Sequence, residues 1–204
     1  MAEITAQMVK ELRERSGAGI MDCKTALKEA QGDLAQAELN LRKRGIAIAQ
    51  KKSSRAANEG MIGTYIHPGS KLGVLVEMNC ETDFVARTDE FQQLVHDVAM
   101  HIAATDPQFI RKEDISEEAL ENEKQVQRAR ALQEGKPEHV IEKIIEGRMG
   151  KFYEEICLLE QPFVKDSAVT IGELIASKIA QLGENITVSR MSRFKVGEAG
   201  SAES

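Results

Sequence analysis

Residues 61–78, with the sequence MIGTYIHPGSKLGVLVEM, decide the fold. Two runs rich in apolar and β-branched residues, 61–67 and 72–78, flank Pro68-Gly69-Ser70-Lys71. Pro and Gly favour tight turns, and apolar runs on both sides of such a turn are typical of a β-hairpin. A two-stranded hairpin is only marginally stable alone, so a third strand is expected to complete the sheet.

The expected third strand lies far along the chain, at residues 186–196. A period of two places four of its apolar residues on one face: Ile186, Val188, Phe194 and Val196. Because helical patterns fill the sequence between hairpin and strand, the class predicted is α+β with a three-stranded antiparallel sheet, and not a βαβ repeat.

Three helical segments are expected between these strands. The first starts near Thr88 and ends before Asp106-Pro107. The second is a helical hairpin over 116–153, broken by Gly135 and Pro137, because Gly suits a helix end and Pro a first turn. Thr170 and Glu173 form a capping box for the third, which Gly183 ends.

Towards the N-terminus, three short helices are expected within residues 1–45, with Thr5 and Asp33 as N-caps. This length is near the lower limit for an independent bundle. The predicted division is a three-helix domain at 1–45, a linker at 46–59, an α+β core at 60–197 and a flexible tail at 198–204.

The composition is that of an ordinary globular chain, with 42% hydrophobic and 29% charged residues and a net charge of −6. An acidic chain is a poor clamp for nucleic acid, although the basic stretch 42–55 keeps RNA binding open as an alternative. Cys23, Cys80 and Cys157 form no CxxC pair, and no apolar run is long enough to span a membrane. We therefore expect a cytoplasmic protein without membrane contact.

The sequence offers little to catalysis. Gly17-Ala18-Gly19 lacks the third Gly of a phosphate loop. His96 and His101 are five residues apart, which does not match the spacing of metal ligands on a helix. Cys80 is the best candidate nucleophile, but no His lies near it in sequence to activate it. No catalytic residue, metal ligand or cofactor is expected.

The segment Glu81-Thr82-Asp83-Phe84-Val85-Ala86-Arg87 allows two interpretations. Phe84 and Val85 fold back over the sheet while Asp83 caps a turn, or Asp83 and Phe84 project as a wedge for a partner protein. Composition alone favours the first interpretation. In the second interpretation, a fully buried Phe84 would contribute about 1.5–3 kcal/mol.

Two long motifs carry a resemblance to a known family. The stretch VKELRERSGAGIMDCKTAL, residues 9–27, closely resembles the first signature of bacterial elongation factor Ts. Glu81–Ala86 is similar to its second signature, and Gly147-Arg148-Met149 and Gln161-Pro162-Phe163-Val164 match the family pattern.

The resemblance implies a non-enzymatic guanine nucleotide exchange factor for the GTPase elongation factor Tu, in its GDP-bound and nucleotide-free states. It implies that the N-terminal helices are ubiquitin-associated-like and dock on the partner through Arg13, Ile20 and Met21. It also implies that the second signature, Thr82, Asp83, Phe84 and Val85, wedges into the partner near its bound magnesium, disturbs the magnesium and phosphate site, and so promotes GDP release and GTP reloading.

Only one hairpin, one closing strand and one helical hairpin are present, which resembles the short form of the family. That form implies a homodimer and a two-plus-two complex with elongation factor Tu; the helical hairpin is left to contact either the partner or the other protomer. The alternatives are an RNA-binding accessory protein using residues 42–55, and an adaptor that holds ubiquitin-like partners through residues 1–54.

Overall fold

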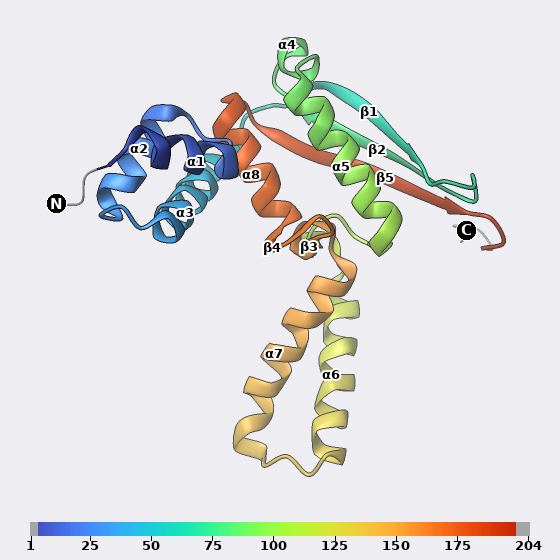
Figure 1. The fold of residues 1–204 in the computed structure, drawn as a ribbon. Helices are drawn as coiled ribbons and strands as arrows, with labels where there is room; N and C mark the ends of the chain where they lie inside the picture. Colours follow the sequence, from blue (N-terminus) through green and yellow to red (C-terminus); the bar gives the residue numbers. More distant parts are fainter. Residues whose placement is uncertain (1–3, 199–204) are drawn as a thin grey trace.

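A computed structural model describes residues 4–198 of the chain, and its N-terminal part is a three-helix bundle (Figure 1). The helices are α1 (Ala6–Ser16), α2 (Ile20–Glu29) and α3 (Leu34–Lys52). Thr5 and Asp33 cap α1 and α3 through their side chains, as predicted. The bundle buries five small or apolar side chains: Leu12, Cys23, Ala26, Leu27 and Ala37.

Helix α3 is longer than expected and joins the bundle to the core. It continues to Lys52, through the first half of the segment 46–59 that the sequence suggests as a linker. It packs against α8 (Ile171–Leu182). Gly45 is buried against the α8 backbone, and a Cβ there would make an ordinary contact, 3.6 Å from the Ala176 carbonyl oxygen. Whether 1–45 acts as a separate domain stays a prediction.

The core sheet has the predicted three antiparallel strands, in the order β1-β2-β5. Strands β1 (Glu59–Ile66) and β2 (Leu72–Cys80) form the hairpin, and β5 (Ile186–Lys195) pairs with β2 from Leu72↔Lys195 to Cys80↔Ile186. Gly69 and Ser70 turn the hairpin with positive φ angles of 93° and 54°.

The predicted face of β5 is wrong in its second half. Pairing passes from Met78↔Val188 to Glu77↔Arg190, which leaves Ser189 as an extra residue in a β-bulge. One extra residue reverses the alternation of side chains along the rest of a strand. Ile186 and Val188 are buried, but Phe194 and Val196 are 67% and 72% exposed on the opposite face.

Two helices cover the inner face of the sheet, α8 and α5 (Asp89–Thr105) (Figure 1). Their apolar side chains meet those of β2 and β5 in the main core, including Phe91, Leu94, Val98, Ile171, Val76 and Met78. Gly63 on β1 lets α5 lie close, because a Cβ there would come within 2.2 Å of a Val95 methyl carbon.

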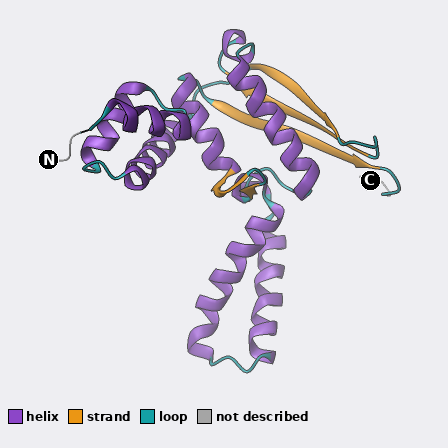
Figure 2. Ribbon diagram, viewed as in Figure 1, coloured by secondary structure: helices purple, strands orange, loops and turns teal. Residues whose placement is uncertain are grey.

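The helical hairpin projects away from the core, as Figures 1 and 2 show. It consists of α6 (Glu117–Gln133) and α7 (Glu138–Ile156), and the break between them is at the predicted place. Its own small core contains Ala131, Ile141, Ile145 and Met149. The base holds two short helices, η1 (Lys112–Asp114) and η2 (Leu158–Glu160), and the strand pair β3 (Pro162–Phe163) and β4 (Asp166–Thr170).

A buried polar cluster holds this base to α5. His101 is fully buried, and its Nδ1 accepts a hydrogen bond from the Val164 amide at 3.3 Å. Its Nε2 therefore carries the proton and donates to Gln161 Oε1 at 3.0 Å. Burial lowers the pKa of His101, so its role is that of a neutral structural side chain. The predicted tail, 198–204, lies almost entirely outside the described residues.

The close approach of α5 to the sheet predicts the effect of a single methyl group. Replacing Gly63 by Ala should lower the free energy of unfolding by about 1–3 kcal/mol, because the new Cβ forces α5 away from β1. Urea unfolding followed by circular dichroism measures this change. Gly150→Ala on α7 is the matched control, since a Cβ there meets no atom within 4 Å. It should be neutral or stabilising by up to ~1 kcal/mol, and equal losses in both variants would contradict the packing argument.

Candidate functional site

The segment after β2 forms a single helical turn, α4 (Asp83–Ala86), between the sheet and α5. Thr82 is its N-cap, and the Thr82 hydroxyl accepts a hydrogen bond from the Val85 amide at 3.4 Å. The Cys80 thiol donates to the Thr82 carbonyl at 3.1 Å. The turn is thus held at its start by the end of β2.

The turn divides its side chains between the core and the solvent. Val85 is half-buried against the main core and Ala86 is buried. Phe84 points the other way and is 79% exposed. The interpretation in which Phe84 folds back over the sheet is therefore wrong, whereas Val85 does lie against the core. Exposure of the largest side chain of the turn is not explained by packing within this chain.

Asp83 lies beside Phe84 and is half-exposed. Its carboxylate accepts a hydrogen bond from Arg87 at 2.7 Å, one helical turn along the chain. An exposed ion pair at this spacing contributes only about 0.3–0.5 kcal/mol. Asp83 can therefore exchange Arg87 for another partner at little cost.

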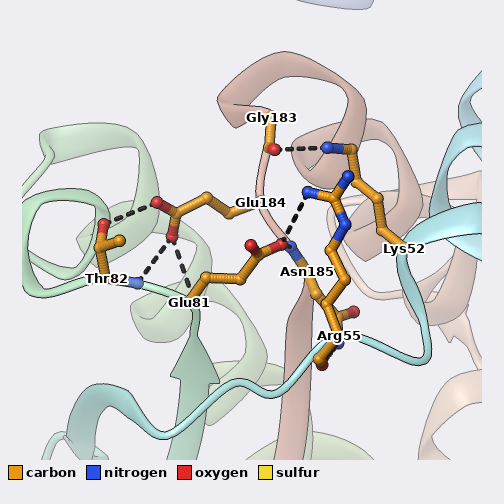
Figure 3. A network of polar contacts seen from close by, with 7 residues as sticks. All are labelled: Lys52, Arg55, Glu81, Thr82, Gly183, Glu184 and Asn185. Atoms are coloured by element: carbon orange, nitrogen blue, oxygen red, sulfur yellow. Dashed lines mark hydrogen bonds and ion pairs between the residues drawn. The ribbon is translucent and has the colours of Figure 1, made fainter.

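A polar network lies beneath this turn (Figure 3). Glu184, on the turn between α8 and β5, accepts three hydrogen bonds from the start of the signature segment. Its Oε2 accepts from the Glu81 and Thr82 amides at 3.1 and 3.0 Å. Its Oε1 accepts from the Thr82 hydroxyl at 2.6 Å. Residues about 100 positions apart are joined here.

Glu81 makes the reciprocal contact. Its carboxylate accepts from the Asn185 amide at 2.7 Å and from Arg55 at 3.4 Å. The Asn185 hydrogen bond, with the nearby positive charges of Arg55 and Lys52, holds the pKa of Glu81 below its ordinary value. Glu184, Asn185 and Arg55 were missed by sequence reasoning, because no local pattern links them to residues 81–87.

The second group of predicted site residues lies on the N-terminal bundle. Ile20 and Met21 begin α2 and are 56% and 71% exposed, so neither belongs to the bundle core. Arg13 is exposed near the end of α1. The bundle and α4 lie in separate parts of the molecule (Figure 1), so the structure does not bring the two groups together into one site.

The thiols are poorly suited to nucleophilic chemistry. All three cysteines are free and buried. Burial raises the pKa of the Cys80 thiol, and it raises that of Cys157 to about 11. Residues 4–198 contain no group of three or more His, Cys, Asp or Glu side chains placed to hold a metal ion. Within the same residues, no helix is both long and apolar enough to cross a membrane.

The basic stretch 42–55 is largely engaged within the chain. Arg44 donates to Glu29 at 2.5 Å, and Arg55 is paired with Glu81. Arg42 donates to the Ala168 carbonyl at 3.1 Å, and Lys52 to the Gly183 carbonyl at 2.5 Å. These contacts join parts of the fold and weaken the RNA-binding alternative.

Comparison with known proteins gives a consistent result. The family model described as elongation factor TS matches residues 3–198. Elongation factor Ts of Solibacter usitatus is 67% identical over 204 residues, which cover 100% of this chain and 96% of that protein. The corresponding proteins of Koribacter versatilis and Carboxydothermus hydrogenoformans are 59% and 56% identical, covering 97% and 96% of this chain and 90% of each relative.

The lowered pKa of Glu81 predicts a contribution to stability that depends on pH. A carboxyl group with a depressed pKa in the folded state stabilises above its ordinary value of 4.5, and this stabilisation is lost as the pH falls through the lower folded value. The difference in unfolding free energy between wild type and Glu81→Gln should therefore be largest near pH 7 and shrink below about pH 4.5. Urea unfolding across this range measures it. Glu121→Gln, at an exposed position on α6, is the control. A difference in unfolding free energy for Glu81→Gln that does not change with pH would refute the lowered pKa of Glu81.

Proposed function

Since the chain belongs to the elongation factor Ts family, we propose that it serves translation by releasing GDP from the GTPase elongation factor Tu, which then reloads GTP. The observation that carries this proposal is Phe84, a large apolar side chain held in solvent on a short turn beside a carboxylate. Such a pair is suited to insertion into another protein and contributes little to the stability of this one.

The proposed mechanism is displacement. Asp83 and Phe84, with Thr82 and Val85 supporting them, enter the partner near its magnesium and GDP phosphates. Magnesium requires near-ideal octahedral geometry, so a small shift of the elements that hold it weakens nucleotide binding. By linkage, the factor binds nucleotide-free partner more tightly than GDP-bound partner, and GDP weakens the factor to the same extent.

The N-terminal module is proposed as a second contact with the same partner. Ile20 and Met21 present adjacent apolar side chains to solvent, and Arg13 adds a positive charge. Docking through this module holds the factor on the partner while the wedge acts. In this proposal the chain carries out no covalent step and needs no cofactor. It acts in the cytoplasm and requires no direct contact with nucleic acid.

We further propose that two copies pair through the outer face of the sheet, as expected for a short family member. Five exposed apolar side chains share this face: Ile62, Ile66, Leu75, Phe194 and Val196. Apolar surface gathered in this way is uncommon on a monomer, and face-to-face sheet packing buries it. Two factors paired back to back present two wedges, which suits a two-plus-two complex with elongation factor Tu.

The exchange proposal is tested by release of a fluorescent GDP analogue from elongation factor Tu. Wild type should accelerate release, and Asp83→Ala with Phe84→Ala should slow it on the order of 10- to 100-fold, because about 1.5–3 kcal/mol of burial is lost. Since Phe84 is largely in solvent and Asp83 makes only an exposed ion pair, the unfolding free energy should change by less than about 0.5 kcal/mol.

The matched control is Ile48→Ala, which shortens an exposed apolar side chain on α3. It should leave exchange unchanged. Normal exchange by the Asp83 and Phe84 double variant would refute the wedge, even for a chain that still binds elongation factor Tu.

Pairing through the sheet is tested by light scattering over a concentration series. Wild type should have twice the mass of one 22.5 kDa chain, and Leu75→Glu with Phe194→Glu should have the mass of one chain. Two buried carboxylates on a self-pairing face oppose association strongly. Val126→Glu on the exposed surface of α6 is the control. A double variant that remains dimeric would place the interface elsewhere.

A further inference from the structure

Helix α4 is too short to hold the orientation of its own exposed side chains. It contains four residues, and an isolated helical turn is unstable because nucleation is costly. Phe84 adds little packing within the chain, since it is 79% exposed. The Asp83–Arg87 pair is exposed and weak. Val85 and Ala86 pack α4 against the core. The direction in which Asp83 and Phe84 point is therefore set by this packing together with the contacts at the base of the turn.

The contacts at the base converge on one carboxylate. Glu184 Oε2 receives two successive backbone amides, those of Glu81 and Thr82, and Oε1 receives the Thr82 hydroxyl. These are the residues immediately before Asp83. Hydrogen bonds to an ionised acceptor are roughly twice as strong as neutral ones, so this cluster is a strong long-range attachment of the segment.

The bond to the hydroxyl has a second consequence. Thr82 donates its only hydroxyl proton to Glu184, so the lone pairs of Thr82 Oγ1 are free to accept the Val85 amide. This N-cap bond closes α4 together with the backbone bond from the Ala86 amide to the Thr82 carbonyl at 3.3 Å. The Glu184 carboxylate thus makes the Thr82 hydroxyl an acceptor for the Val85 amide, and it also fixes where that hydroxyl lies. Hydrogen bonds in such a chain strengthen each other.

Glu184 is itself firmly placed. It lies between Gly183, whose φ of 79° ends α8, and Asn185, which is buried at the start of β5. The Asn185 amide donates to Glu81, and its side-chain amide donates to the Arg55 carbonyl at 2.8 Å. The Gly183 carbonyl accepts from Lys52. Figure 3 shows these residues around Glu184, so the backbone on both sides of Glu184 is fixed by contacts with Lys52, Arg55 and Glu81.

We propose that Glu184 is a positioning residue of the exchange wedge: it holds Asp83 and Phe84 in the orientation in which they enter the partner. This inference rests on the proposed exchange function. Glu184 acts through Thr82 and Glu81 and does not itself touch the nucleotide site. Its loss should lower the maximal exchange rate, while docking through the distant N-terminal module continues.

The test measures GDP release as a function of factor concentration, which separates the maximal rate from the half-saturating concentration. Glu184→Ala should lower the maximal rate about tenfold and change the half-saturating concentration by less than about threefold. Glu184→Gln should lie between wild type and Glu184→Ala, because its carbonyl still accepts the two amides while its NH2 group competes with Val85 for Thr82 Oγ1.

Two controls separate positioning from general damage. Glu160→Ala removes the carboxylate that pairs with Lys112 at 2.9 Å near the hairpin base, and it should leave both exchange parameters unchanged. Amide hydrogen exchange of Glu184→Ala should be faster at residues 81–86 and unchanged in the N-terminal bundle.

A double-mutant comparison decides the matter. In the background of Asp83→Ala with Phe84→Ala, adding Glu184→Ala should slow GDP release no further, because the side chains that it positions are already gone. An equal additional loss in that background would show that Glu184 acts elsewhere and overturn the inference. The inference would also be overturned if Glu184→Ala exchanged normally while the Asp83 and Phe84 double variant was impaired. That result would leave the proposed exchange function itself intact. A wild-type chain that fails to accelerate release would remove the exchange function and this inference with it.

Discussion

The antiparallel pairing of β2 with β5 is the contact on which the rest of this structure depends. It joins residues 72–80 to 186–195, so the middle of the chain and its C-terminal part form one sheet. The hairpin alone would be marginal. The same pairing sets Cys80 opposite Ile186, and the turn before β5 therefore lies beside the segment that follows β2. Glu184 reaches Thr82 for this reason alone.

Helix α4 has an exposed part, which is available to a partner, and an ordered base, which fixes its position. Val85 and Ala86 hold the turn to the core, while Asp83 and Phe84 are left in solvent. An exposed Phe84 contributes little to folding, so its position comes from the packing of Val85 and Ala86 together with the hydrogen bonds below them. A charged acceptor that receives two amides and a hydroxyl supplies direction as well as strength, which apolar packing does not.

The bulge at Ser189 decides the character of the other exposed surface. Before it, Ile186 and Val188 face the core; after it, Phe194 and Val196 face solvent. The Ser189 hydroxyl donates to Asn79 across the strands and helps to hold the extra residue. Arg193 turns inward instead and pairs with Asp106 at 3.1 Å. One residue of shift therefore adds Phe194 and Val196 to the exposed apolar side chains of β1 and β2, and the proposed pairing of two chains rests on this combined face.

The sequence by itself determined the elements, because caps, turns and periodicity act over a few residues. Thr5, Asp33 and Thr170 cap helices as predicted, the hairpin turns at Gly69 and Ser70, and the motifs at 9–27 and 81–86 identify the family. Only the tertiary structure decided that Phe84 faces solvent, that α3 continues to Lys52, and that β5 changes face at its bulge. It alone brought Glu184 to Thr82. These features depend on contacts between residues about 100 positions apart, and no spacing rule within a segment contains that information.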